Sequence, residues 1–208
     1  MEKGLLITIE GGEGSGKTTA AKSVVEKLKE VGYDAVYLRE PGGNATAEKI
    51  RNIVVNEEGL DPYVQLLLFS AARACIVDDI KNAIDSGKIV VMDRYVLSTL
   101  VYQGRVGGIP IYQIKTLTNI ATKGLAKPNI EFILDISAKE GLKRIADNNR
   151  ETNAFDKLNI DFHNKVNEAF RHTSYAQERY IIDASKDKEE VFNSIIKYIY
   201  KYLINNGF

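Results

Sequence analysis

Residues 11 to 18 carry the clearest chemical motif of the chain, GGEGSGKT in the pattern G-x-x-x-x-G-K-[ST]. Glycines at 11, 14 and 16 allow a curled backbone whose N–H groups point at a phosphate. Lys17 can then reach the β- and γ-phosphates of a nucleotide, and the Thr18 hydroxyl can ligate Mg²⁺. A plain glycine-rich turn is the alternative. We expect the donor nucleotide to contact Gly11, Gly12, Glu13, Gly14, Ser15, Gly16, Lys17 and Thr18.

A second acidic group is expected near the magnesium ion. Two apolar runs end in an aspartate, VVMD at Asp93 and FILD at Asp135. Each carboxylate could simply be a charged residue at the end of a strand. Asp93 is favoured because Arg94 follows it directly, which places an acid beside a phosphate-binding base. The Asp93 carboxylate would hold magnesium, partly through water, or orient an attacking phosphate oxygen.

The elements that must position these motifs alternate between short apolar runs and longer stretches with helical spacing. The apolar runs are mostly continuous, as in strands that are covered on both faces. We predict strands at Leu5 to Ile9, Ala35 to Leu38, Ile89 to Met92, Phe132 to Ile136 and Tyr180 to Ile182, and helices at Thr18 to Glu30, Pro62 to Ser86 and Glu189 to Leu203. This order predicts an α/β fold with a parallel sheet and helices on both faces.

Length and composition exclude several classes of protein. A chain of 208 residues with 44% hydrophobic residues is expected to form one domain, 1–208. Its 28 basic and 28 acidic residues give no surplus for binding nucleic acid. One Cys and two His make a zinc centre unexpected. No apolar run is long enough to span a membrane, and no leader is recognised, so we expect a cytoplasmic protein.

The arginines point to a kinase rather than a switch. Neither N-K-x-D nor D-x-x-G, the motifs of a GTPase switch, occurs in the sequence. Two phosphate groups that meet in one site need several cations, because phosphoryl transfer depends on positioning and charge neutralisation. Arginines at predicted loops would meet that need, and they are Arg39, Arg51, Arg73, Arg94, Arg105, Arg144 and Arg150. We therefore expect a small kinase with a phosphorylated or anionic acceptor.

Motifs along nearly the whole chain resemble the thymidylate kinase family of P-loop proteins. After the phosphate-loop motif, the matching segments are REPGG at 39–43, EKIR at 48–51, LLLFSAAR at 66–73, DRYVLSTLVYQG at 93–104, LDISAKEGLKR at 134–144 and IDAS at 182–185. The resemblance implies a three-layer P-loop kinase fold with a five-stranded parallel sheet and a short lid. It also implies phosphorylation of dTMP to dTDP with ATP and Mg²⁺ as cofactors.

The same resemblance assigns roles in the acceptor site. Phe69 would stack on thymine and Arg73 would hydrogen-bond its edge, although Phe69 alone would be interpreted as a core aromatic residue. Tyr102 would leave no room for a 2′-hydroxyl. Arg144 would pack on adenine. The implied acceptor set is Arg39, Glu40, Arg51, Phe69, Arg73, Arg94, Ser98, Thr99, Tyr102 and Gln103, and the catalytic set is Lys17, Asp93, Arg94 and Arg150. Glu10 and Glu13 flank the phosphate loop, and both could be solvated acids.

The polar stretch 146–159 is interpreted as part of a lid at about 144–157, with an ordinary surface loop as the alternative. Because the phosphate loop contains no Arg, the chain resembles the bacterial type, whose lid supplies an arginine. Arg150 is the candidate for that arginine finger. Ala154 stands where the family has a second lid arginine, and Cys75 and Ile76 stand where a polar residue is common.

Cys75 should pack in the core, and His163 and His172 should be solvated. The long apolar stretch 62–86 should form a homodimer interface, as the resemblance implies. A kinase for another pyrimidine monophosphate, or a nucleotide-binding sensor with a weakened lid, remains the alternative function.

Overall fold

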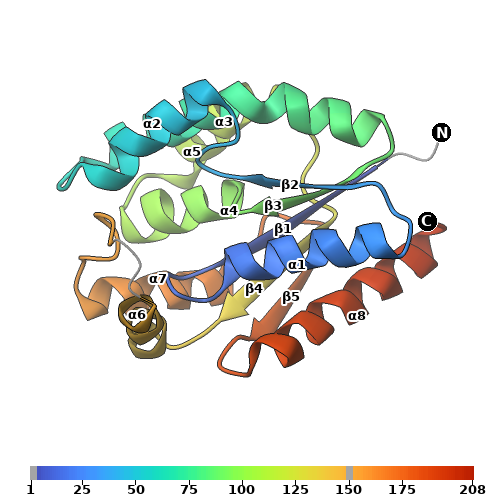
Figure 1. Cartoon of the computed structure of the whole chain (residues 1–208). Helices are drawn as coiled ribbons and strands as arrows, with labels where there is room; N and C mark the ends of the chain where they lie inside the picture. The colour runs from blue at the N-terminus through green and yellow to red at the C-terminus, as the bar shows by residue number, and fades with distance from the viewer. Residues whose placement is uncertain (1–3, 149–151) are drawn as a thin grey trace.

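Five parallel strands form the central sheet of the computed structural model, which describes residues 4–148 and 152–208. The strands are β1 (Leu5–Gly11), β2 (Ala35–Arg39), β3 (Ile89–Asp93), β4 (Ile130–Asp135) and β5 (Glu178–Asp183). Their spatial order is β2-β3-β1-β4-β5, and every neighbouring pair is parallel (Figure 1). The predicted five-stranded parallel sheet is confirmed, with strand ends that differ from the prediction by one or two residues.

Helices cover both faces of the sheet, as predicted. Apolar spacing predicted α1 (Lys17–Glu30), α3 (Pro62–Asp85) and α8 (Lys188–Asn206). It missed the shorter elements, which are α2 (Ala45–Asn56), α4 (Val96–Thr99), the π-helical η1 (Leu100–Val106), α5 (Ile111–Ala121), α6 (Ala138–Asp147) and α7 (Ile160–His172). These elements are 4 to 13 residues long, and short segments give only a weak periodic signal.

Two apolar layers explain why the central strands are nearly continuous apolar runs. On one face, α1 and α8 pack against residues such as Ile7 and Ile9. On the other face, α3 packs against Leu6 and Met92, while η1 and α7 pack against Ile133. Every residue of β1 and β3 is buried. Because the strands are parallel, their carboxyl ends meet at one edge, where ligands bind in open α/β sheets.

Side-chain caps mark where several helices begin. Asn44 accepts a hydrogen bond from the backbone N–H of Ala47 at the start of α2. Asp61 caps α3 in the same way, with Pro62 at the first helical position. Asp187 accepts from two backbone N–H groups at the start of α8. Such caps satisfy amide groups that have no partner inside the helix.

Three expectations about individual residues can be compared directly with the structure. Arg144 lies in α6, which continues to Asp147, so the first predicted lid residues are helical. His163 is 3% exposed and therefore not solvated, because it lies on the inner face of α7, whereas the His172 side chain is 73% exposed. Cys75 lies on α3 and packs, partly buried, against the apolar layer that includes Leu6 and Met92, as expected.

Candidate active site

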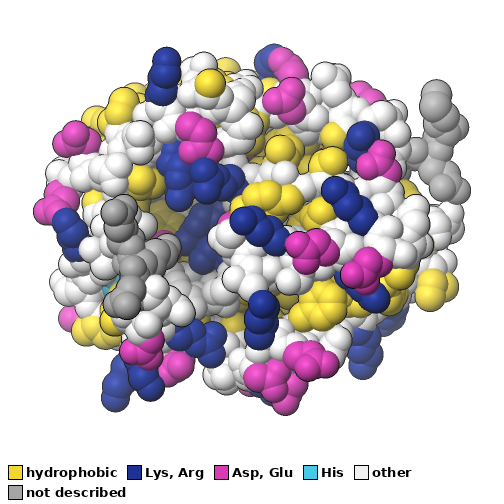
Figure 2. All heavy atoms as spheres, viewed as in Figure 1, with side chains coloured by type: hydrophobic (Ala, Val, Ile, Leu, Met, Phe, Trp, Pro, Cys, Tyr) yellow, Lys and Arg dark blue, Asp and Glu magenta, His cyan; other side chains and the backbone are white. Residues whose placement is uncertain are grey.

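A cavity of about 600 Å³ opens at the carboxyl ends of β1, β2 and β3. Figure 2 shows Lys and Arg side chains gathered in this hollow beside α2. Of the acceptor, catalytic and donor residues expected from the sequence, the lining includes Glu13, Gly14, Ser15, Gly16, Lys17, Thr18, Arg39, Glu40, Arg51, Phe69, Arg73, Asp93, Arg94, Ser98, Thr99, Tyr102, Gln103 and Arg144. Arg150 lies outside the described residues, and Arg105 is exposed and does not line the cavity.

The phosphate loop joins β1 to α1 and curls as its glycines allow. Gly11, Gly14 and Gly16 have φ of 142°, 71° and 89°, which favour glycine over any residue with a Cβ. Lys17 Nζ donates to the Gly12 carbonyl at 2.6 Å, and Ser15 Oγ donates to the same oxygen at 2.9 Å. Burial lowers the pKa of Lys17 to about 8. The ammonium group is thus folded onto the loop at the start of α1, where an anion is favoured.

Backbone contacts support the loop from behind. A Cβ added to Gly14 would lie 2.0 Å from the Gly141 carbonyl oxygen, and one added to Gly141 would lie 2.3 Å from the Glu13 oxygen. Asn167 fills the space beside Gly12, and its Nδ2 donates to the Ile136 carbonyl at 2.7 Å. Sequence reasoning missed Gly141 and Asn167, because neither belongs to a local phosphate-binding pattern.

Thr18 and Asp93 place two side-chain oxygens next to each other in the cavity. Thr18 Oγ1 donates to Asp93 Oδ2 at 2.5 Å, and Tyr37 Oη donates to the same oxygen at 3.3 Å. Hydroxyl and carboxylate oxygens are the donors Mg²⁺ prefers, and it usually adds phosphate and water ligands. No cluster of three or more candidate metal ligands occurs in the described part of the chain. The donor set therefore fits a magnesium ion held largely by phosphates and water.

The alternative aspartate has a different setting. Asp135 accepts from Arg171 Nε at 3.1 and 3.0 Å, and it does not line the cavity. Of the two carboxylates proposed from the sequence, only Asp93 faces Thr18.

Arg94 directly follows β3 and has a left-handed conformation with φ of 65°, which is uncommon for a residue with a side chain. Its Nη2 donates to Glu13 Oε1 at 2.7 Å, and its Nη1 donates to Ser98 Oγ at 3.0 Å. Tyr102 Oη also donates to Glu13 Oε1 at 2.9 Å, and its ring lies 5.3 Å below the guanidinium. Glu13 is therefore not a solvated acid but holds both the arginine and the tyrosine.

Arg73 and Glu40 form a buried ion pair in the lining of the cavity. Arg73 Nε and Nη2 donate to Glu40 Oε2 at 2.9 and 2.6 Å, and both side chains are almost fully buried. Arg73 Nη2 also donates to Thr99 Oγ1 at 3.1 Å. Its third nitrogen, Nη1, is buried and has no acceptor among the described residues. A buried donor without a partner is costly, so this nitrogen is suited to an acceptor on a bound ligand.

Phe155 is a cavity residue that sequence reasoning did not assign. It lies on the turn that precedes α7, and its ring centroid is 6.3 Å from Phe69 and 5.7 Å from Tyr102. The neighbouring Ala154 N–H donates to the Val55 carbonyl at 2.8 Å and fixes this turn to the end of α2. An aromatic residue inside an otherwise polar stretch was the signal that could have identified it.

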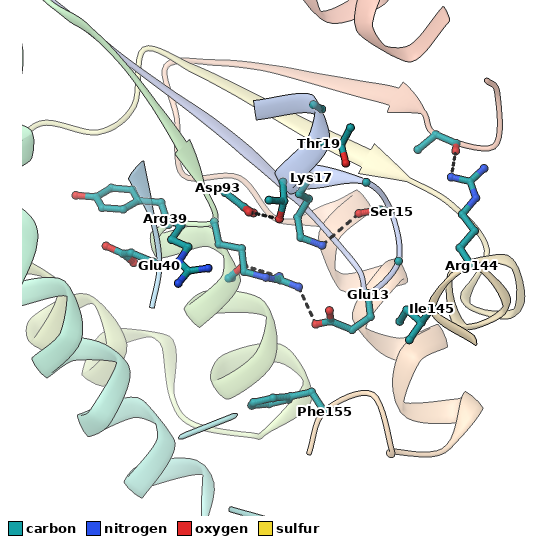
Figure 3. Close-up of a pocket in the computed structure, with 18 of the residues that line it drawn as sticks. Glu13, Ser15, Lys17, Thr19, Arg39, Glu40, Asp93, Arg144, Ile145 and Phe155 are labelled. Atoms are coloured by element: carbon teal, nitrogen blue, oxygen red, sulfur yellow. Dashed lines mark hydrogen bonds and ion pairs between the residues drawn. The ribbon is translucent and has the colours of Figure 1, made fainter. Parts of the chain in front are cut away.

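Of the other arginines, Arg39 and Arg51 lie at the rim of the cavity, and Arg144 lies at the end away from Asp93. Arg39 Nη2 donates to Glu48, at 2.9 Å, and Arg51 Nη1 donates to the Pro41 carbonyl at 2.9 Å. Arg144 Nη1 donates to the Ala184 carbonyl at 2.9 Å, beside the IDAS segment. Figure 3 shows Arg144 apart from Asp93, with Lys17 and Ser15 between them. Of the arginines predicted to lie in loops, Arg51, Arg73, Arg105 and Arg144 lie in helices, and Arg39 is the last residue of β2.

The fold and the site together define a P-loop kinase: a parallel sheet, a phosphate loop opening into α1, and an arginine-lined pocket in the same cavity. The family model described as Thymidylate kinase matches residues 9–195. The protein named thymidylate kinase from Staphylococcus epidermidis strain RP62A is 43% identical over 200 residues, which cover 93% of this chain and 98% of that protein.

Two further relatives carry the same name. The Thermoanaerobacter sp. strain X514 protein is 37% identical over 205 residues, covering 97% of this chain and 100% of its own length. The Bacillus pumilus protein is 36% identical over 209 residues and 98% of each chain. The chain therefore belongs to the thymidylate kinase family, as its motifs suggested.

Proposed function

We propose that the protein transfers the γ-phosphoryl group of ATP to dTMP, giving ADP and dTDP. One observation carries the proposal: the phosphate loop and the pocket of Phe69, Arg73 and Tyr102 open into a single cavity. A donor phosphate on the loop and an acceptor phosphate at Arg94 would then meet in that cavity. Membership of the thymidylate kinase family supports dTMP as the acceptor.

The chemistry needs no covalent enzyme intermediate. An oxygen of the dTMP phosphate attacks the γ-phosphorus in line while the bond to the bridging oxygen of ADP breaks. Lys17 offsets the charge that develops on the transferred group, and Arg94, with Arg39 or Arg51, holds the acceptor phosphate. Thr18 and Asp93 would hold a magnesium ion through their side-chain oxygens, and that ion would neutralise charge on the phosphates. Arg150 stays the predicted arginine finger.

The acceptor pocket supports a pyrimidine deoxynucleotide. Phe69, Arg73 and Tyr102 all line the cavity, and the Nη1 of Arg73 has no partner among the described residues. Phe69 would stack on the base, Arg73 would donate to its edge, and Tyr102 would crowd the sugar. Arg144, Lys188 and Phe192 line the opposite end, which suits the adenine of ATP. The part of the chain that the structure describes includes no helix that could cross a membrane. A cytoplasmic location stays a prediction.

A coupled assay of ADP release with a panel of nucleoside monophosphates tests the proposal. We expect dTMP to give the highest kcat/KM. Faster turnover of another pyrimidine monophosphate would reassign the acceptor. Binding of ATP and dTMP without ADP release would favour a sensor rather than an enzyme.

We also propose a homodimer through α3. Tyr63, Val64 and Leu67 lie on one face of its first two turns and are 50%, 42% and 57% exposed. Exposed apolar patches mark interaction sites, and the same patch on two copies can pair about a two-fold axis. Light scattering should give twice the 23.2 kDa of one chain. Leu67→Glu should give the monomer mass. Ile204→Glu, at an exposed position on α8, is the control and should leave the mass unchanged. A parent protein that is monomeric at micromolar concentration would contradict the proposal.

A further inference from the structure

Glu10 is a fully buried carboxylate that the reaction as described does not use. It lies at 0% exposure on β1, directly before the first glycine of the phosphate loop. Burial raises its pKa to about 7. Placing a carboxylate in the interior costs several kcal/mol unless charges and hydrogen bonds compensate for it. An apolar side chain would fill this position without that cost, so the bonds that Glu10 makes indicate its purpose.

Both oxygens of Glu10 contact the segment that carries Arg94. Oε1 accepts from the backbone N–H of Tyr95 at 2.7 Å, and Oε2 accepts from Ser98 Oγ at 2.6 Å. Tyr95 follows Arg94 in the chain, so the first bond fixes the peptide that leaves the left-handed residue. A left-handed backbone costs a non-glycine residue about 1–2 kcal/mol, and surrounding bonds must hold it.

The second bond reaches the Arg94 guanidinium. Ser98 Oγ, held by Glu10, accepts from Arg94 Nη1 at 3.0 Å, and the Gly11 carbonyl accepts from the same nitrogen at 3.1 Å. Glu10 thus restrains Arg94 at two points, its backbone and its side chain. Glu10 also interacts electrostatically with five charged side chains, which are Arg94, Arg73, Lys17, Glu40 and Glu131.

We propose that Glu10 is a positioning residue that holds Arg94, through Tyr95 and Ser98, in the orientation that receives the acceptor phosphate. This inference rests on the proposed function, because the role of Arg94 toward the acceptor is itself proposed. Glu10 lies in β1 and is not among the residues that line the cavity, so a displaced Arg94 should weaken acceptor binding while the ATP side is spared.

Glu10→Gln keeps the shape of the side chain, but it replaces one accepting oxygen with an amide that faces a donor. We expect the KM for dTMP to rise about tenfold or more while the KM for ATP stays within about twofold. Glu131→Gln is the matched control. Glu131 is another buried glutamate on the same face of the sheet, where it accepts from Tyr175 N at 3.4 Å. Its substitution should change neither constant.

A double-mutant cycle separates positioning from a general loss of structure. In an Arg94→Met background, Glu10→Gln should lower kcat/KM for dTMP by less than about twofold, because the group that it positions is gone. An equal factor in both backgrounds would overturn the proposal. The dTMP affinity measured by calorimetry gives the same double-mutant cycle without any turnover. A parent protein that binds dTMP but releases no ADP would therefore contradict the proposed function without contradicting the role of Glu10.

Ser98→Ala provides a second variant that disturbs the fold less, since Ser98 is only partly buried. It cuts the bond to the guanidinium and leaves the Tyr95 bond in place. We expect a smaller rise in the dTMP dissociation constant than for Glu10→Gln, again absent in the Arg94→Met background. A rise of the same size in both backgrounds would contradict the chain of contacts from Glu10 to Arg94.

Discussion

Arg73 and Glu40 form an ion pair inside the protein, with 2.6 Å between Arg73 Nη2 and Glu40 Oε2 and side chains that are 2% and 5% exposed. The pair joins α3 to the segment after β2, and it leaves Arg73 Nη1 directed to no described acceptor. One arginine thus has a structural partner on one side and a free donor on the other. We therefore expect Glu40 to matter for stability and for the orientation of Arg73 Nη1, the donor that we propose binds the base.

Removing the charge of Glu40 should destabilise the protein strongly. Glu40→Gln leaves a buried guanidinium without its counter-charge, which typically costs about 3–5 kcal/mol. Urea unfolding measures this loss. Glu48→Gln is the control, because the Glu48 side chain is 40% exposed and its pair with Arg39 should contribute about 0–1 kcal/mol. Similar losses for the two variants would show that the buried pair is not special.

Lys17→Ala should remove most of the turnover. The ammonium group lies on the phosphate loop, where it can stabilise charge on the transferred phosphoryl group. We expect kcat to fall on the order of a thousandfold or more, with an unchanged urea midpoint. Near-normal turnover would contradict the assignment of the phosphate loop.

The lowered pKa of Lys17, about 8, predicts a pH dependence for ATP binding. As the pH rises through about 8, the free enzyme loses the ammonium charge, so kcat/KM for ATP should fall. The kcat itself should persist to higher pH, because bound phosphates favour the charged form. Lys17→Arg keeps its charge at alkaline pH, and its profile for kcat/KM should lack this fall. A fall near pH 8 in both proteins would assign the titration to another group.

The raised pKa of Glu131 predicts how the stability of the folded protein changes with pH. Burial, with repulsion from Glu10, raises its pKa from 4.5 to about 8. Between these values the folded protein holds a proton that the unfolded chain has lost, so stability declines as the pH rises, by up to about 1.4 kcal/mol per pH unit. Glu131→Gln should remove the part of this decline that Glu131 causes, leaving the part due to Glu10, and it should be more stable than the parent at pH 8. Exposed Glu26→Gln should leave the stability profile unchanged, and a parallel profile for Glu131→Gln would refute the prediction.

Ala154→Arg tests the lid. If Arg150 alone supplies the lid charge, a second arginine should raise kcat, by about tenfold for 1.4 kcal/mol of transition-state stabilisation. The backbone bond from Ala154 to Val55 does not depend on the side chain, so the turn should persist. Ala154→Gln adds a long side chain without charge and should give no gain. If the arginine variant is no faster than the parent, the idea of a weakened lid fails.

The sequence predicted those parts of the site that depend on local patterns. The phosphate loop and Asp93 need only a strand, a turn and the start of a helix, and these features are legible in short segments. The burial of Glu10 and His163 was not predicted, because it depends on which helices cover that face of the sheet. Phe155 reaches the site from the turn before α7, and Asn167 reaches it from α7 itself. Both residues are far from the phosphate loop in the sequence.

The arginines show the same limit. Their number and type indicated a phosphate pocket, yet Arg51 and Arg73 lie in helices, and helix placement decides where they point. The ion pair between Arg73 and Glu40 joins residues 33 positions apart and has no sequence signal of its own. Tertiary packing therefore fixed the contacts that spacing could not.

The contact between Gly14 and Gly141 sets a limit that substitution cannot relax. Each residue already has the smallest side chain, so an enlargement of one cannot be offset by a reduction of the other. The distance between the phosphate loop and α6 is consequently fixed by main-chain atoms. Because α6 ends at Asp147, within the predicted lid at about 144–157, the distance from the start of that predicted lid to the phosphate loop is set by the backbone itself.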